Sequence, residues 1–256
     1  MLPPQVIATY TGWTIDLAWD GDAGKTWRLV STDGDRRFAK VRPRGGHPSL
    51  ADERDRLVWA RTWMTVPDVV EYGSDGDVEW LITSGLDGED ATIVKVWMEP
   101  DVLVPLLGAG LRTWHETLPV EACPFDFLLD TALEHCRQRV RDGQTSWDGL
   151  RGRNDRVTPS EALGELERNR PPDEDVVVCH GDYCFPNVFL TDGRITGFLD
   201  VGELGIADRW WDIAIGAWST TWNVDPSYEP LFYEGYGIEQ DADRIAYYRL
   251  LYELAG

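Results

Sequence analysis

The sequence predicts an α+β protein of two lobes, a strand-rich N-terminal lobe with one helix and a mainly helical C-terminal lobe. Three observations support this fold class. Short apolar runs separated by turn residues occupy the first third of the chain, helical spacing dominates after Asp87, and the turn-rich run Gly85–Gly88 separates the two patterns. We therefore expect two domains, 1–86 and 87–256, in a chain of 256 residues that can bury two modest cores.

The N-terminal lobe begins with an expected antiparallel hairpin. Trp27–Val30 and Arg37–Val41 flank the turn Asp33–Asp35, and apolar residues in helical spacing follow from Leu50 to Met64. Two further strands are expected at 69–72 and 80–83. The lobe is thus predicted to be an antiparallel sheet with one helix.

The C-terminal lobe is predicted to be helical over 103–118, 127–140, 160–169, 211–218 and 242–254. A polar loop, 142–158, separates the second and third of these helices. A short strand over 175–179 leads into a conspicuous motif, and a small hairpin follows around the turn Thr191-Asp192-Gly193.

The chain is strongly acidic, with 45 Asp and Glu against 24 Lys and Arg and a net charge of −21. A polyanion repels the phosphate backbone, so we expect no nucleic-acid partner. The same field would draw in a polycationic substrate. Solubility or a salty habitat explains the total charge equally well, so the charge alone does not identify a reaction.

The expected cellular compartment is inferred from the cysteine pattern and from the lack of a signal peptide or membrane span in the sequence. The four cysteines form no C-x-x-C pair and are expected as free thiols in a reducing cytoplasm. The N-terminus lacks the pattern of a signal peptide, and no apolar run reaches the length of a membrane span. We expect a cytoplasmic protein without a membrane anchor, and a monomer.

The most specific motif is His180-Gly181-Asp182 with Asn187 five residues after the aspartate. Catalytic loops of kinases carry H-x-D-x-x-x-x-N, in which the Asp accepts the hydroxyl proton and the Asn holds Mg²⁺. Asp200-Val201-Gly202 follows thirteen residues after Asn187, where a kinase has its second Mg²⁺-binding carboxylate. An amide and a carboxylate suit hard Mg²⁺. Each motif is weak alone, but their order and spacing together predict phosphoryl transfer.

The N-terminal lobe supplies the expected phosphate contacts. Lys40 lies in a predicted strand, as does the lysine that grips the α- and β-phosphates in kinases. Glu53 on the next helix could pair with it, although Asp52 and Asp55 are close competitors. The turn Asp20–Lys25 could cover the phosphates with its backbone N–H groups.

The chain resembles the aminoglycoside O-phosphotransferases, in particular the branch that modifies 3′ and 3″ hydroxyls. Three segments carry the resemblance most clearly: Cys179-His180-Gly181-Asp182-Tyr183-Cys184-Phe185-Pro186-Asn187, Gly197-Phe198-Leu199-Asp200-Val201-Gly202 and Ala207-Asp208-Arg209-Trp210-Trp211-Asp212-Ile213-Ala214. The resemblance implies a two-lobed protein-kinase-like fold and a nucleoside triphosphate, ATP or GTP, used with Mg²⁺.

The family's roles transfer to matching positions of this chain. Asp182 would orient or deprotonate the acceptor hydroxyl, Asn187 and Asp200 would carry Mg²⁺, and Lys40 would hold the phosphates. Adenine would hydrogen-bond the backbone around Ser84, Gly85 and Leu86. The product would be an aminoglycoside phosphorylated on its 3′-OH, or alternatively its 3″-OH, and the activity would confer resistance.

The acceptor site departs from the family pattern. Family members bind the cationic drug with acidic side chains, but Arg151 and Arg153 occupy positions of the polar loop where acidic residues are expected. Asp148 and Asp155 remain as candidates there, and Glu253 matches a drug-binding glutamate near the C-terminus. A kinase of another small hydroxylated metabolite or antibiotic, and a catalytically silent nucleotide-binding pseudokinase, therefore stay open as alternatives.

Several other residues are expected to be structural. Asp208 and Asp212 should cap and pair within the helical lobe, with Arg209 as a partner for either. His115 is expected to be structural. Trp147 is kept as a possible substrate contact, whereas the tryptophans Trp210, Trp211, Trp218 and Trp222 are expected in the core.

Overall fold

The computed structural model describes residues 1–21, 24–145 and 157–255. Contacts within the chain divide it into two compact units. The first consists of Met1–Glu89 together with Phe189–Glu203, and the second of Asp90–Val188 together with Leu204–Gly256. The architecture is α+β, as expected from the sequence.

The first unit is built on a five-stranded antiparallel sheet of order β1-β2-β3-β5-β4. Its strands are β1 (Thr14–Gly21), β2 (Gly24–Val30), β3 (Arg36–Pro43), β4 (Val69–Asp75) and β5 (Val78–Ser84). Strands β2 and β3 form the predicted hairpin, in which Trp27 pairs with Ala39 and Arg28 with Phe38. The two strands predicted over 69–72 and 80–83 are present as β4 and β5.

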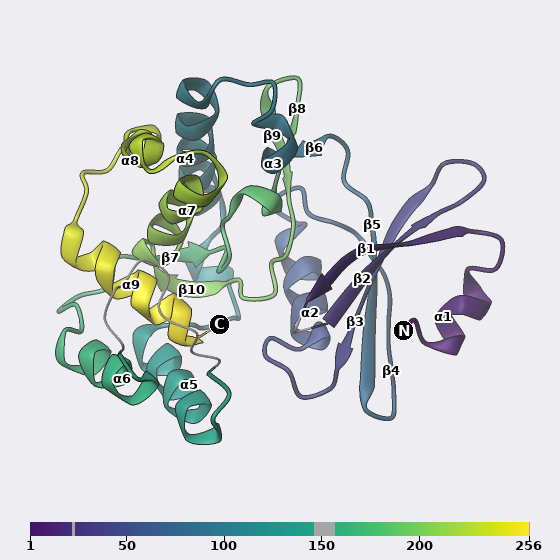
Figure 1. The fold of residues 1–256 in the computed structure, drawn as a ribbon, viewed down its shortest axis with the longest axis horizontal. Helices are drawn as coiled ribbons and strands as arrows, with labels where there is room; N and C mark the ends of the chain where they lie inside the picture. Colours follow the sequence, from purple (N-terminus) through teal and green to yellow (C-terminus); the bar gives the residue numbers. More distant parts are fainter. Residues whose placement is uncertain (22–23, 146–156, 256) are drawn as a thin grey trace. The chain divides into compact units, whose positions relative to one another are not determined.

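Helices α1 (Pro4–Thr9) and α2 (Leu50–Ala60) lie on opposite sides of this sheet (Figure 1). The α1 side forms a core of Leu2, Val6, Tyr10, Leu29, Ala39, Val41, Trp80 and Ile82. Because side chains alternate across a strand, Lys40 lies on the opposite face from Ala39 and Val41, which is the face that α2 covers. A Ser49–Asp52 capping box fixes where α2 begins.

A second, small sheet has the order β6-β8-β9. It consists of β6 (Glu89–Asp90), β8 (Val188–Thr191) and β9 (Arg194–Phe198). Strands β8 and β9 are the hairpin predicted around Asp192-Gly193, and the chain leaves β9 directly into Asp200. The backbone N–H of Phe198 donates to the Thr65 carbonyl, which joins this hairpin to the rest of the first unit.

The second unit is mainly helical. Its helices are α3 (Ala91–Val94), α4 (Pro100–Thr117), α5 (Leu129–Asp142), α6 (Pro159–Arg168), α7 (Trp210–Asn223), α8 (Glu229–Tyr236) and α9 (Ala242–Ala255), with short 3₁₀ turns at Val120–Ala122, Phe185–Asn187 and Pro226–Tyr228. Helix α7 is central, because every residue from Trp210 to Thr220 is buried. It packs against α4, α8 and α9 (Figure 1).

Two short antiparallel strands, β7 (Val176–Cys179) and β10 (Gly205–Asp208), complete the second unit. Val177, Val178 and Cys179 of β7 are buried, so this strand is a rigid base for the motif that begins at His180. Among the helices of the described ranges, none is both long and apolar enough to cross a lipid bilayer.

Candidate active site

Lys40 in the first unit lies between two carboxylates. Its Nζ donates to both carboxylate oxygens of Glu53 at 2.9 Å and to Asp200 Oδ1 at 2.7 Å. The Lys40 side chain is 21% exposed and that of Glu53 only 7%. The structure therefore confirms the expected Lys40–Glu53 ion pair, while Asp52 caps α2 instead.

Electrostatics keep the Lys40 ammonium charged. Burial acts to lower the pKa of Lys40, but the carboxylates of Asp200 and Glu53 outweigh it and raise that pKa above the usual lysine range. Burial raises the pKa of the Glu53 carboxyl, and the two hydrogen bonds from the ammonium oppose that rise. We assign both groups as charged, because each is hydrogen-bonded to the other.

Asp200 follows β9 in a tight turn. Its φ of 56° is in the left-handed region, which non-glycine residues rarely adopt. At Gly202, two residues later, a Cβ would lie 2.9 Å from Pro48 Cγ and 3.7 Å from Glu53 Cβ. The turn thus needs a glycine to pack beside α2, and this packing holds the Asp200 carboxylate next to Lys40.

The end of β5 is the segment expected to contact adenine. The Ser84 N–H donates to the Asp68 carbonyl and the Gly85 N–H to the Arg36 carbonyl, both at 2.9 Å. The Leu86 carbonyl accepts from the Arg36 guanidinium at 3.2 Å. Two of the backbone N–H groups in the predicted segment are therefore already used within the protein.

The turn expected over the phosphates is shorter than predicted. Strand β1 extends to Gly21 and β2 begins at Gly24, with Asp20 paired to Lys25 in the ladder. The Lys25 ammonium also forms an ion pair with the Asp20 carboxylate. Asp22 and Ala23 lie outside the described residues, so the phosphate-covering role stays a prediction.

In the second unit, the catalytic-loop motif leaves β7 and brings Asp182 and Asn187 together. The Asn187 amide group donates to Asp182 Oδ2 and to the Asp182 carbonyl, each at 2.9 Å. It also donates to Cys184 Sγ at 3.2 Å. Because the NH₂ end of this side chain faces Asp182, its oxygen is the end available to a cation. An amide oxygen here and a carboxylate at Asp200 are the hard donors that Mg²⁺ prefers, so these residue types fit that ion.

Asp212 on α7 holds the backbone at the start of this loop. Its fully buried carboxylate accepts from the N–H groups of His180 at 2.6 Å and Gly181 at 2.9 Å. It also contacts His115 Nε2 at 3.0 Å, and His115 Nδ1 reaches the Tyr236 hydroxyl. This network confirms the structural assignment of Asp212 and His115.

Sequence reasoning missed Tyr252. This residue is on α9, and its hydroxyl donates to Asp182 Oδ1 at 2.8 Å. Seventy residues separate the two positions, and a tyrosine in a helical pattern is no signal for contact with a carboxylate. The resemblance predicts a drug contact at the adjacent Glu253, which lies half-buried on the same helix.

The other expected acceptor residues are not described. Asp148 and Asp155, like Trp147, Arg151 and Arg153, lie within 146–156, outside the described residues. Trp222 differs from expectation: Trp210, Trp211 and Trp218 are buried, but Trp222 is 43% exposed at the end of α7, where its ring packs on Trp218.

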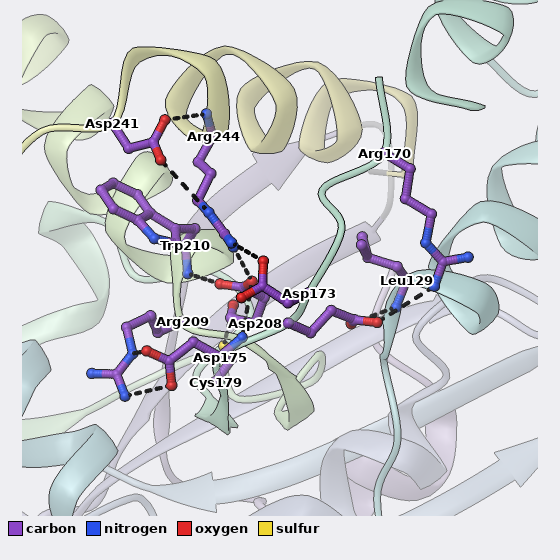
Figure 2. Close-up of polar contacts among 11 residues, drawn as sticks. Leu129, Arg170, Asp173, Asp175, Cys179, Asp208, Arg209, Trp210, Asp241 and Arg244 are labelled. Atoms are coloured by element: carbon purple, nitrogen blue, oxygen red, sulfur yellow. Dashed lines mark hydrogen bonds and ion pairs between the residues drawn. The ribbon is translucent and has the colours of Figure 1, made fainter. Parts of the chain in front are cut away.

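The expected partners of Arg209 were wrong. Figure 2 shows that Arg244 of α9, not Arg209, pairs with the buried Asp208, while Arg209 binds Asp175. Asp208 also accepts from the N–H of Trp210 at the start of α7 and from that of Asp175. Arg209 also donates to the Tyr236 hydroxyl at 3.2 Å.

Comparison with known proteins assigns the chain to a family. Residues 17–248 match the model of the phosphotransferase enzyme family. An aminoglycoside 3′-phosphotransferase of Streptomyces fradiae is 41% identical over 229 residues, which are 84% of each protein. A crystal structure of an aminoglycoside 3′-phosphotransferase of type VIII superposes with a TM-score of 0.86 at 33% identity, covering 98% of this chain and 96% of that one.

A further solved structure includes ligands. Aminoglycoside phosphotransferase APH(3″)-Id from Streptomyces rimosus, in complex with ADP and streptomycin, superposes with a TM-score of 0.79 at 28% identity, over 98% of this chain and 96% of that one. The two-lobed kinase-like fold expected from the motifs is confirmed by these likenesses. The protein described here therefore belongs to the phosphotransferase enzyme family and, within it, to the aminoglycoside phosphotransferases.

Proposed function

We propose that this protein transfers the γ-phosphoryl group of ATP or GTP to a hydroxyl of an aminoglycoside, with the 3′-OH as the favoured position. The observation that carries the proposal is the Lys40 cluster, in which one partly buried ammonium contacts both Glu53 and Asp200. Kinases use these same three groups to hold the phosphates and their metal ion. Membership in the aminoglycoside phosphotransferases indicates that the acceptor is an aminoglycoside.

The reaction forms a bond between the acceptor oxygen and the γ-phosphorus and breaks the bond from that phosphorus to the β–γ bridging oxygen. The nucleoside diphosphate leaves, and the acceptor proton passes to the Asp182 carboxylate. Asn187 and Asp200 would hold Mg²⁺, which neutralises charge on the phosphates. Because the transition state is loose, positioning and charge matter more than a strong base.

Nucleotide recognition is assigned to the first unit, and the catalytic loop and acceptor to the second. Lys40 would contact the phosphates. Since the N–H groups of Ser84 and Gly85 donate within the sheet, we assign the Ser84 carbonyl and the Leu86 N–H to the edge of adenine. The ADP in the Streptomyces rimosus structure supports a nucleotide as co-substrate.

An aminoglycoside acceptor is supported by the relatives and by charge. The Streptomyces fradiae relative is named a 3′-phosphotransferase, which favours the 3′-OH, and the activity would confer resistance. The streptomycin complex of APH(3″)-Id keeps the 3″-OH as the second candidate. Asp148, Asp155 and Glu253 are the carboxylates proposed for the ammonium groups of the drug, and a net charge of −21 favours a polycation.

A nucleotide-consumption assay with Mg²⁺ tests the reaction against kanamycin, neomycin, streptomycin and hygromycin. We expect drug-dependent turnover that falls by roughly 10²- to 10⁴-fold in Asp182→Ala, the range for loss of a general base. Asp200→Ala should abolish turnover, and NMR of the product would identify the phosphorylated hydroxyl. Turnover of another hydroxylated compound alone would redirect the acceptor assignment, and nucleotide binding without any turnover would indicate a pseudokinase.

We further propose that the protein acts as a monomer in the cytoplasm, without nucleic acid. None of its four cysteines, which all lie within the described ranges, forms a disulfide, as suits a reducing compartment. The negative charge disfavours association with polyanions. Light scattering after size-exclusion chromatography measures the mass directly, and a dimer mass would contradict the monomer.

A further inference from the structure

We propose that Tyr252 is a positioning residue that holds the Asp182 carboxylate in its reactive orientation. This inference rests on the proposed function, in which Asp182 receives the acceptor proton. It assigns a role to a side chain at the C-terminal end of α9, and all the contacts that carry it lie within the second unit.

Two donors hold the two oxygens of one carboxylate. The Tyr252 hydroxyl donates to Asp182 Oδ1 at 2.8 Å, and the Asn187 amide donates to Asp182 Oδ2 at 2.9 Å. A carboxylate held at both oxygens cannot rotate about its Cβ–Cγ bond without losing both hydrogen bonds. Each oxygen can accept a second hydrogen bond, so an acceptor hydroxyl can still bind Asp182.

The ring of Tyr252 is held in place by Trp211, which is also hydrogen-bonded to the catalytic loop. Its ring packs edge-on against Trp211 of α7, with ring centroids 6.3 Å apart. The Trp211 indole N–H donates to the Gly181 carbonyl at 2.7 Å, one residue before Asp182, and Phe127 packs on Trp211 from another direction. One buried indole therefore fixes the positions of both the loop backbone and the tyrosine ring.

Helix α9 gives the tyrosine a rigid base. Leu251 and Leu254 are fully buried on either side of it in sequence. At the other end of the helix, Arg244 binds the buried Asp208 at 2.7 Å. The hydroxyl is thus presented by an anchored element, and its contact with Asp182 is a property of the packed fold.

The expected consequence is a loss of kcat without a loss of nucleotide affinity. A hydrogen bond to a charged group contributes enough free energy to change a rate by roughly 10- to 100-fold, and small displacements of a reacting group are costly. Tyr252→Phe keeps the ring against Trp211 and removes only the hydroxyl. We expect kcat to fall about 10-fold, with the KM for MgATP changed less than about two-fold.

Tyr247→Phe is the matched control. Tyr247 is on the same helix and buried, and its hydroxyl has no hydrogen-bond partner within the part of the chain that the structure describes. This substitution also removes a phenol hydroxyl from α9. Because that hydroxyl does not contact Asp182, kcat should stay at the wild-type value. Thermal unfolding of both variants shows whether either change disturbs packing.

A double-mutant cycle separates positioning from a structural role. Tyr252→Phe is measured in the wild type and in Asp182→Ala, by single turnover with enzyme in excess. The acceptor is whichever of kanamycin, neomycin and streptomycin reacts fastest, or water if none does. If Tyr252 acts through Asp182, the 10-fold loss seen with the carboxylate should shrink below about two-fold without it.

Four outcomes would overturn the positioning role. These are wild-type kcat in Tyr252→Phe, an equal loss in both backgrounds, an equal loss in Tyr247→Phe, and a Tyr252→Phe variant that is unfolded at the assay temperature. An inactive Asp182→Ala with a fully active Tyr252→Phe overturns this inference alone. A fully active Asp182→Ala overturns the proposed function as well.

Discussion

Lys40 illustrates how the direction of a side chain depends on the position of its residue in a strand. Its neighbours Ala39 and Val41 point into the core beneath α1, so alternation directs the ammonium toward α2 and Asp200. Two carboxylates at hydrogen-bond distance define where this ammonium lies before any nucleotide binds. These contacts occupy all three N–H donors of the ammonium, so in the proposed reaction a phosphate oxygen would have to replace one of the carboxylate contacts.

Lys40→Met should raise the KM for MgATP and lower kcat. Loss of one charge-assisted contact to the phosphates should reduce kcat/KM by roughly 10- to 100-fold. Steady-state kinetics with MgATP varied at saturating acceptor would measure it. Arg28→Met, which removes an exposed cation from the same sheet, should leave both constants unchanged. Wild-type kinetics in Lys40→Met would remove Lys40 from the phosphate site.

The site residues differ in how far sequence could predict them. Asp182, Asn187 and Asp200 follow motif spacings, whereas Lys40 and its pairing with Glu53 follow from the order of strand and helix. Tyr252 has no such spacing, because its contact with Asp182 arises from the packing of α9 on α7. Arg209 was assigned wrongly because sequence cannot rank Arg209 against Arg244, which lies 35 residues farther along the chain and reaches Asp208 from another helix.

Among elements, α8 escaped prediction because its sequence contains both helix-breaking residue types. Pro230 lies in the first turn, where proline is tolerated. Gly235 packs against α4 so closely that a Cβ there would lie 2.1 Å from the Pro105 carbonyl oxygen. The glycine that argues against a helix is required by the contact between helices. Strongly amphipathic α5 and α6, in contrast, were predicted within a few residues of their bounds.

The contact between α9 and the start of α7 should contribute strongly to stability. Asp208 is fully buried, and Arg244 is its cationic partner (Figure 2). Arg244→Met leaves that carboxylate buried without a counter-charge, which should cost about 3 kcal/mol of unfolding free energy. Urea denaturation followed by circular dichroism would measure the loss.

Arg209→Met is the matched comparison for that measurement. Its partner Asp175 is 60% exposed, so the loss should stay below about 1 kcal/mol. Equal losses in the two variants would mean that burial of Asp208 does not set the strength of its ion pair. Since Arg244 anchors the helix that carries Tyr252, Arg244→Met should also lower kcat.

At the scale of the whole molecule, the net charge of −21 acts over distances that no single contact spans. It attracts a polycationic drug and repels the nucleoside triphosphate, which is itself an anion. Long-range attraction raises the rate of encounter, and dissolved salt screens it. Adaptation to solubility would produce the same composition, so the charge needs a kinetic test.

Raising the salt concentration from ~20 mM to ~300 mM shortens the screening length from roughly 20 Å to about 6 Å. We expect kcat/KM for the aminoglycoside to fall roughly 5- to 10-fold over this range. The same enzyme provides the control, because kcat/KM for anionic MgATP should stay constant or rise. If kcat/KM fell in parallel for both substrates, salt would be acting on the enzyme itself and not on the attraction of the drug. If kcat/KM changed for neither substrate, solubility would remain as the explanation of the charge. A fall confined to the drug would make the acidic composition part of substrate capture.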